Sequence, residues 1–146
     1  MCNNDCKDST PWLALEFAGP VEVTKVIIYN RGDKDAGSAA RTKNVEVRLV
    51  DELPTSGYQM HTGGQLLGTF SGPGKKGEII KVEGPARTGR YVLVQMNNRD
   101  CLNLHEVEAF GRFVLDTTTT TEQMPGDSVK WVPAPITLLA ILLLLF

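Results

Sequence analysis

Cysteines and aromatic residues are scarce in this chain, and its charges nearly cancel. The 146 residues include three cysteines and 7% aromatic residues, and the formal net charge is −2. Such a balance gives no long-range field that would attract nucleic acid or an anionic membrane surface. No apolar run reaches the length of about 18 residues that a standard membrane-spanning helix needs. An apolar content of 42% is nevertheless too high for a chain that is disordered throughout.

The usual motifs of catalysis are absent as well. The sequence contains no Gly-x-Ser-x-Gly, no His-Glu-x-x-His and no phosphate-binding loop. It has no Cys-x-x-Cys pair, and its cysteines and two distant histidines do not give the spacing of a zinc site. Residues 72–77 are rich in glycine and lysine, but they join two predicted strands and therefore predict a hairpin loop. We expect that the protein is not an enzyme.

Both ends of the chain differ from its middle. Residues 1–5 lack the basic and apolar regions of a secretory leader. Residues 113–135 contain five consecutive threonines and predict an extended stalk that is open to O-glycosylation. Residues 136–146 are apolar except for Thr137. As a helix this tail would span about 16 Å, only half of a hydrocarbon core, which is typical of a lipid-anchor signal or a truncated membrane segment.

From these ends we expect an extracellular, cell-surface protein that is attached to the membrane through its tail and whose N-terminus is incomplete. A tail that results from an error of gene prediction is the alternative.

Residues 1–112 predict an all-β module with very little helix. Short runs of alternating or β-branched residues recur at residues 12–17, 21–29, 45–49, 65–70, 78–82, 91–96 and 102–110. Turn-forming residues separate these runs, for example at residues 18–20 and 88–89. The alternation of the last run changes phase at His105-Glu106, which predicts a β-bulge there. The pattern as a whole is typical of a sandwich or a barrel around one core.

Six segments of this module occur in an order and spacing that resemble a known family. They are PW (11–12), VIIYNRGD (26–33), RTKNVEVR (41–48), LGTFSGP (67–73), GRYV (89–92) and LNLHEVE (102–108). Together they resemble the F-type (fucose-binding) lectin module, a member of the discoidin or coagulation-factor type C group of galactose-binding-like domains. The resemblance covers residues 2–112 and implies a jelly-roll β-sandwich whose loops cluster at one end.

The resemblance also implies a sugar site, in which one histidine, two arginines and an aspartate grip terminal α-L-fucose. Arg31 and Asp33 match the Arg-x-Asp motif, and Arg41 matches the second arginine if residues 34–40 contain a short insertion. Asn4 stands in the place of the histidine, and its amide both donates and accepts hydrogen bonds but has a different reach. Apart from the family, a guanidinium fixed by a carboxylate offers paired donors to a hydroxyl-rich sugar. A solvated loop of mixed charge is the alternative interpretation.

The family further implies a structural calcium ion close to the N-terminus. Glu106 would supply a carboxylate and His105 its backbone carbonyl, although the family has a cysteine at the position of His105. Asn3, Asn4 and Asp5 are the candidate substitutes for ligands that would precede residue 1, and Asn3 is the first choice.

Three cysteines leave one thiol over in an oxidised protein. A bridge from Cys2 or Cys6 to Cys101 would join the N-terminus to a late strand, and three separate thiols are the alternative. Cys2 matches the first member of the family's disulfide, and Cys101 lies close to the position of the second.

Three functions follow from the sequence. The first is a cell-surface lectin module that recognises fucosylated glycans or glycoproteins, with a possible oligomer and no role for nucleic acid. The second is a degenerate discoidin-like domain that binds protein partners or lipid and no sugar, through the apolar residues Leu53, Tyr58 and Met60 of one loop. The third is an intracellular structural domain with an accidental apolar end.

Overall fold

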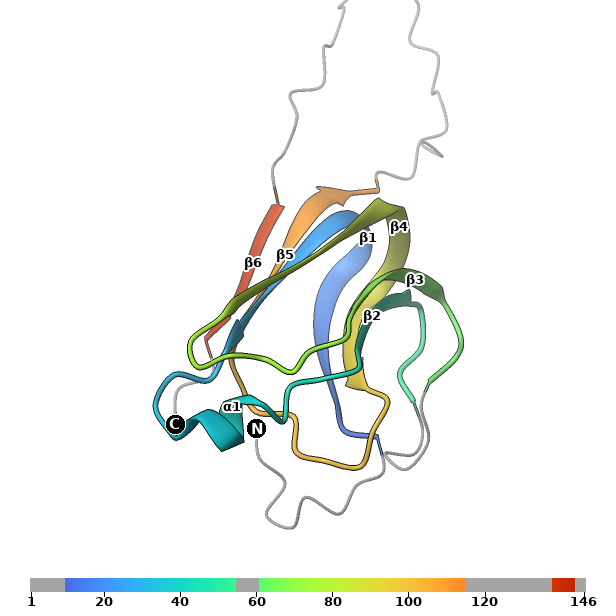
Figure 1. Ribbon diagram of the computed structural model, residues 1–146. Coiled ribbons are helices and arrows are strands. Elements are labelled where there is room, and N and C mark those ends of the chain that lie inside the picture. Colours follow the sequence, from blue (N-terminus) through green and yellow to red (C-terminus); the bar gives the residue numbers. More distant parts are fainter. Residues whose placement is uncertain (1–9, 55–60, 115–137, 144–146) are drawn as a thin grey trace, which may run out of the picture.

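The computed structural model describes residues 10–54, 61–114 and 138–143, the last of these as backbone only. This part of the chain is antiparallel β structure with a single four-residue helix (Figure 1). The elements are β1 (Trp12–Asn30), α1 (Ala36–Ala39), β2 (Val45–Val50), β3 (Gln65–Phe70), β4 (Ile79–Met96), β5 (Leu104–Phe113) and β6 (Leu138–Leu143). The strands lie in the order β3-β2-β4-β1-β5-β6. The predicted all-β sandwich is confirmed.

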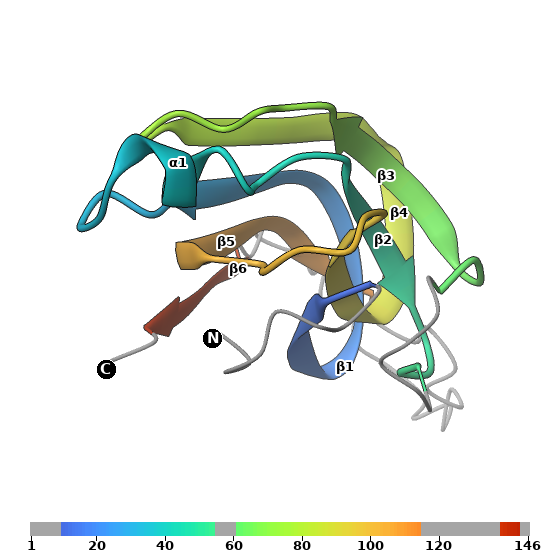
Figure 2. The ribbon, with the colours of Figure 1, turned by 60° about the horizontal axis from the view of Figure 1, so that its bottom comes forward.

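Two long strands run through both layers of the sandwich. Residues 12–16 of β1 pair with residues 91–95 of β4, and residues 25–29 of β1 pair with residues 79–83 of β4. β2 pairs with β4 in the first region, whereas β5 pairs with β1 in the second. Because β1 and β4 bend between these regions, the sheet curls over on itself (Figure 2). The strands of the jelly-roll are therefore joined in one continuous hydrogen-bonded sheet.

Two strand boundaries that the sequence predicts are wrong, because the chain bends there without leaving its strand. Residues 18–20 lie inside β1 and residues 88–89 lie inside β4, so neither segment separates two strands. The pairing shifts register after Glu16 and resumes where Val21 faces Gly89. Pro20 has no N–H for the ladder, but its carbonyl accepts from the Val114 amide at 3.0 Å. The glycine and proline of residues 18–20 thus mark a bend in a strand.

The expected hairpin between β3 and β4 is also wrong. β2 lies between these two strands in the sheet, so residues 71–78 cross from one part of the sandwich to another. The crossing brings the chain beside the end of β1, where the Asn30 amide donates to the Glu78 carbonyl at 2.9 Å. A long-range crossover thereby places residues 71–78 next to the end of β1.

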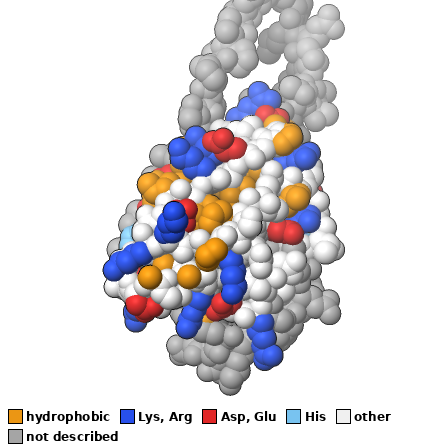
Figure 3. All heavy atoms as spheres, in the orientation of Figure 1, with side chains coloured by type: hydrophobic (Ala, Val, Ile, Leu, Met, Phe, Trp, Pro, Cys, Tyr) orange, Lys and Arg blue, Asp and Glu red, His pale blue; other side chains and the backbone are white. Residues whose placement is uncertain are grey.

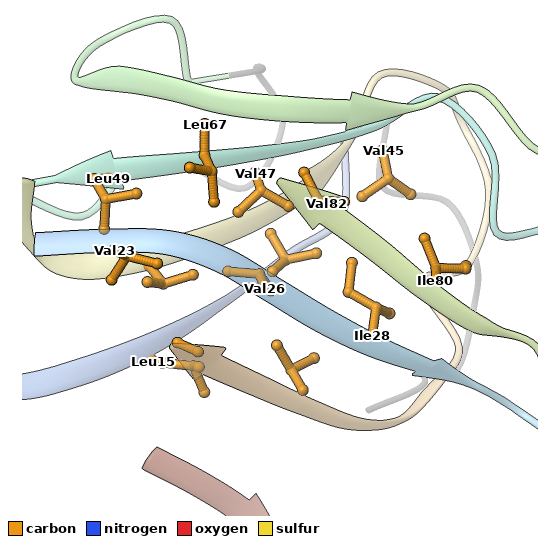
Figure 4. Packing of buried hydrophobic residues seen from close by; sticks show 14 of the residues in the cluster. Leu15, Val23, Val26, Ile28, Val45, Val47, Leu49, Leu67, Ile80 and Val82 are labelled. Carbon is orange, nitrogen blue, oxygen red and sulfur yellow. The ribbon is translucent and has the colours of Figure 1, made fainter. Parts of the chain in front are cut away.

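The core lies between the two layers and consists mainly of β-branched and leucine side chains (Figure 4). In β1, Val26 and Ile28 are buried, whereas the alternating residues Lys25, Ile27 and Tyr29 are only partly buried. Each fully buried aliphatic side chain contributes about 1.5–3 kcal/mol relative to an exposed one. Gly84 allows a close approach of the layers, because a Cβ there would lie 2.1 Å from the Leu67 carbonyl oxygen.

The predicted bulge occurs in β5. Tyr29 faces Glu106 and Asn30 faces Leu104, so His105 is the extra residue on its strand. Its side chain is exposed. The bulge ends the regular pairing of β1 at Asn30, from which the loop of α1 departs.

The other edge of β5 pairs with β6, from Glu106 opposite Leu143 to Gly111 opposite Leu138. The apolar tail of the sequence thus includes an edge strand. Residues 115–137, with the threonine stalk, lie outside the described residues. Among those described, no helix is long and apolar enough to cross a membrane.

Candidate functional site

Three connections meet at one end of the sandwich, the lower end in Figure 1. They are residues 31–44 with α1, residues 71–78 and residues 97–103. Backbone hydrogen bonds join them: Gly74 N donates to Thr42 O at 2.8 Å, Asn44 N to Ser71 O at 3.0 Å, and Asn97 N to Asn44 O at 2.8 Å. This loop end carries Arg31, Asp33 and Arg41, and it is the candidate site.

Arg31 follows the last residue of β1 and is fixed by Asp33. Its Nε and Nη2 each donate to a carboxylate oxygen of Asp33 at 3.1 Å, which is a two-bond fork. The Arg31 side chain is 19% exposed and that of Asp33 is 62% exposed. The hydrogen bonds from Arg31 hold the pKa of Asp33 below its usual value. The fork sets the plane of the guanidinium and uses two of its five N–H donors.

The helix α1 stands between the two arginines in the chain. Asp35 caps its first turn by accepting from the Ser38 amide at 2.8 Å and the Ser38 hydroxyl at 2.9 Å. These hydrogen bonds lower the pKa of Asp35. The cap explains the insertion that the sequence indicates at residues 34–40, because those residues form a compact turn of helix before Arg41.

Arg41 is held by the third connection. Its Nε lies 3.8 Å from one carboxylate oxygen of Asp100, and the Lys43 Nζ lies 3.8 Å from the other. The same carboxylate accepts from the Cys101 amide at 2.9 Å. Two cations therefore share one acid, which leaves the group of Arg41, Lys43 and Asp100 with a net positive charge.

A buried amide lies beneath both arginines. The Asn30 side chain accepts from the Arg31 amide at 3.0 Å and from the Thr42 hydroxyl at 2.8 Å. It donates to the carbonyls of Ala39 at 3.0 Å and Lys75 at 2.8 Å. Asn30 thus ties the segment that bears Arg31 to the segment that bears Arg41.

Three residues of this arrangement are not among those that the sequence predicts: Asn30, Thr42 and Asp100. One signal pointed to Asn30, which continues the inward positions of Val26 and Ile28 as a polar residue. Asp100 gave no signal, because its pairing with Arg41 joins distant parts of the chain.

Of the predicted sugar-binding residues, Arg31, Asp33 and Arg41 lie at the loop end, but the two arginines pair with different acids. Asn4, in the histidine position, lies outside the described residues, as does Asn3.

The predicted calcium ligands lie on β5. Glu106 faces Tyr29 across the ladder, and the Tyr29 hydroxyl donates to the neighbouring carboxylate of Glu108 at 3.1 Å. That hydrogen bond, with burial and both carboxylates, raises the pKa of Tyr29. Within residues 10–54 and 61–114, no three His, Cys, Asp or Glu side chains come close enough to hold a metal ion.

Two further observations concern residues 97–103. The Asn98 amide is buried, and among the residues that the structure describes neither its oxygen nor its nitrogen has a hydrogen-bond partner. Such an amide is a place where a water or a cation fits. Cys101 is buried and disulfide-bonded. Cys2 and Cys6 lie outside the described residues, so the choice between them stays a prediction.

The surface around these loops carries charges of both signs. In Figure 3, basic and acidic side chains are interspersed with apolar ones, and no single sign covers the visible face. This agrees with the near-neutral composition and with a ligand that is not highly charged.

Comparisons with known proteins give a consistent result at the level of structure. No family model matches the chain, and no curated protein matches it in sequence. An F-lectin (fucolectin) from the serum of the striped bass, Morone saxatilis, matches 73% of this chain with 27% identity and a TM-score of 0.60. The match covers 34% of the bass protein, so the chain spans about a third of that lectin's length.

Two further structures are of the lectin domain of lectinolysin. Its lectin domain, complexed with Lewis B antigen, matches 71% of this chain with 30% identity and a TM-score of 0.53, and 67% of that domain is covered. A histidine mutant of the same domain, complexed with Lewis b, matches 74% of this chain and 68% of its own with 28% identity and a TM-score of 0.53.

Proposed function

Because the chain belongs to the F-type lectin family, we propose that it is a carbohydrate-binding module that recognises fucosylated glycans through the loop end of Arg31, Asp33 and Arg41. The solved relatives are lectins, one of them in complex with Lewis B antigen, and they support a binding role rather than an enzymatic one. The observation that carries the proposal is the fork between Arg31 and Asp33.

The chemistry of a fucose site accounts for this fork. Fucose is a neutral sugar whose hydroxyls and ring oxygen accept hydrogen bonds, and an oriented guanidinium donates several of them in one plane. A flexible arginine would lose side-chain entropy on binding, whereas Arg31 is already ordered by Asp33. Arg41 provides a second cationic group, which Asp100 holds from the other side.

A titration of L-fucose into the whole chain tests the proposal. A hydrogen bond from a charged donor contributes about 1.5–3 kcal/mol, so Arg31→Ala should weaken binding about tenfold or more. Arg31→Lys should recover little, because an ammonium group cannot reproduce the planar fork. The control is Arg112→Ala: Arg112 also pairs with an acid, Glu22 at 2.9 Å, but it lies at the far end of β5.

Absence of any fucose affinity in the unchanged protein would contradict the lectin proposal. Binding to protein partners or lipid would then be the function to test, beginning with Leu53, which is an exposed apolar residue.

We also propose a structural calcium ion, with Glu106 and the His105 carbonyl as ligands and Asn3 completing the set from the N-terminal segment. The carboxylate and carbonyl oxygens are the ligand types that calcium prefers. The support is the family pattern, since Glu106 stands on the bulged strand at the position of the family's glutamate.

The serum origin of the bass lectin supports an extracellular location. We also propose attachment to a membrane through the apolar residues 136–146, in which residues 138–143 would leave their pairing with β5. Deleting residues 136–146 from a chain expressed with a secretory leader should release the protein into the medium. An unchanged distribution between cells and medium would reject attachment through the tail.

A further inference from the structure

We propose that Asn30 is the positioning residue of the sugar site: its buried side chain sets the backbone of both arginine-bearing segments. This inference rests on the proposed function. Asn30 is 2% exposed and stands at the last position of β1, where the bulge at His105 ends the regular ladder. It touches no ligand in this role and acts through Arg31 and Arg41.

All of the hydrogen-bonding capacity of the Asn30 amide is used. The oxygen accepts from the Arg31 amide at 3.0 Å and from the Thr42 hydroxyl at 2.8 Å. The nitrogen donates to the carbonyls of Ala39 and Lys75 at 3.0 and 2.8 Å. An asparagine side chain has two N–H donors and two acceptor lone pairs, so no further partner is needed. The four bonds join three segments that are separate in sequence.

Two of the hydrogen-bond partners of Asn30 lie at or directly beside the arginines. Arg31 is bonded at its own backbone, and Thr42 is the direct neighbour of Arg41. A shift of either segment relative to the other must stretch a bond to the same Asn30 oxygen. The relative placement of the two guanidinium groups therefore depends on one side chain, whereas each acid, Asp33 or Asp100, orients only one arginine.

The Asn30 side chain is packed closely against the backbone of residue 74. A Cβ at Gly74 would lie 2.5 Å from the Asn30 Nδ2 and 3.2 Å from the Thr42 Cβ. Thr42 itself is fully buried. A side chain at residue 74 would displace the amide that joins the segments, so glycine is required by close approach.

An apolar residue would suit the strand better than asparagine does. Position 30 continues the buried alternation of Val26 and Ile28, and a leucine there would extend the core. It would, however, leave the Ala39 and Lys75 carbonyls and the Thr42 hydroxyl without this partner, at a cost of unsatisfied buried groups. The asparagine therefore stabilises the loops through hydrogen bonds, whereas an apolar residue would stabilise the core.

A purely structural role is the competing explanation, and the chain contains a matched control for it. Gln95 is also a buried amide, 1% exposed, and it bonds the backbone of one loop residue twice: it accepts from the His61 amide at 3.0 Å and donates to the His61 carbonyl at 2.8 Å. It has no bond to either arginine segment. Loss of a buried amide in general can therefore be separated from loss of this one.

The experiment uses the whole chain and four variants: Asn30→Asp, Thr42→Val, Thr42→Ser and Gln95→Glu. Asn30→Asp keeps the acceptor oxygen and removes both donors, whereas Thr42→Val removes one donor to Asn30. Thr42→Ser retains that donor. Three quantities are measured: the Tm, the affinity for L-fucose at a temperature where every variant is folded, and hydrogen exchange of the Arg31 amide without sugar.

We expect Asn30→Asp and Thr42→Val to weaken fucose binding about tenfold, a factor that corresponds to the loss of a single well-placed hydrogen bond. The Arg31 amide should exchange faster in both variants, because its acceptor oxygen remains but loses the bonds to Ala39 and Lys75 or to Thr42 that hold it in place. Thr42→Ser should restore affinity to within about twofold of the unchanged protein. Gln95→Glu should lower the Tm without changing fucose affinity or Arg31 exchange.

Equal losses of affinity in the Asn30 and Gln95 variants would overturn the positioning role, as would unchanged Arg31 exchange in Asn30→Asp and Thr42→Val. If Asn30→Asp fails to fold, Thr42→Val and Thr42→Ser decide the question. If the unchanged protein binds no fucose, the proposed function fails. The exchange measurement then still shows whether Asn30 orders Arg31, so the two failures are distinguishable.

Discussion

Asp33 accepts two hydrogen bonds from the single guanidinium of Arg31, each at 3.1 Å, only two residues away in the chain. So short a connection leaves the pair on an exposed loop, where an ion pair alone contributes little to stability. Its effect is local: it fixes the direction of a cation at the loop end. The pair is therefore best tested by ligand binding and by local order rather than by unfolding.

The first prediction concerns pH. Arg31 lowers the pKa of Asp33, so the fork is intact above the ordinary pKa of an aspartate, about 4, and is lost as pH falls through the lowered value. Fucose affinity should be constant from about pH 7 to 5 and should fall below about pH 4. In Asp33→Asn the affinity should be lower at neutral pH, and its decline in acid should be reduced. Titrations at several pH values, with circular dichroism to confirm folding, measure this. An identical acid profile in Asp33→Asn would exclude Asp33 as its source.

The second prediction separates the core from the surface with two isoleucines that lie on neighbouring strands. Ile28 is 0% exposed, whereas Ile79 is 55% exposed. Ile28→Ala should lower the free energy of unfolding by about 2–5 kcal/mol, because it leaves a cavity between the layers. Ile79→Ala should change it by less than about 0.5 kcal/mol. Urea unfolding of both variants is the measurement, and similar losses in the two would contradict the inward face assigned to β1.

The strands of this fold could be predicted from local pattern, but the way they join could not. The alternation in residues 45–49 identifies β2, the short strand-like run at residues 65–70 identifies β3, and the change of phase at His105 identifies the bulge. Residues 18–20 look like a turn, yet the ladder resumes on the far side of them. Whether a glycine and a proline end a strand or bend it depends on the partner strand, which the local sequence does not contain.

The same distinction holds for the site. Arg31 and Asp33 are adjacent enough that their fork follows from spacing and charge, whereas Asp100 reaches Arg41 only through the fold. Asn30 lies between these cases. Its inward position could be inferred from the alternation of β1, but its four partners come from segments that only the crossover of residues 71–78 and the α1 loop bring together.

The third prediction concerns the acid shared by Arg41 and Lys43. Asp100→Asn removes the charge that holds both cations at 3.8 Å, so Arg41 should become less ordered. Since these contacts are long and Arg41 is partly exposed, fucose affinity should fall only about two- to fivefold, well under 1.4 kcal/mol. Asp51→Asn, an exposed acid after β2, is the control. A loss as large as that of Arg31→Ala would mean that Asp100 itself contacts the sugar.

The fourth prediction tests calcium. If Glu106 is a ligand, calcium should raise the Tm of the unchanged chain and a chelator should lower it, because a ligand that binds only the folded state stabilises it. Glu106→Gln should remove this difference. Glu108→Gln is the matched control, since Glu108 is its neighbour on the same face and bonds Tyr29 instead. If neither calcium nor a chelator changes the Tm, the calcium proposal is rejected, and the proposal of a sugar site is not affected.

The last prediction concerns the residue in the histidine position. Asn4→His introduces the imidazole that the family pattern has there, with a donor or acceptor nitrogen farther from the backbone than an amide reaches. If Arg31 and Arg41 form the rest of the site, this change should strengthen fucose binding about tenfold, equivalent to one additional hydrogen bond. Lys7→His places the same group three residues away and should have no effect. The double variant Asn4→His with Arg31→Ala should lose the gain, because a histidine bonded to the same sugar depends on the arginine for its orientation. A gain that survives Arg31→Ala would show that the imidazole binds elsewhere, and equal gains from Lys7→His and Asn4→His would reject the family's geometry at this position.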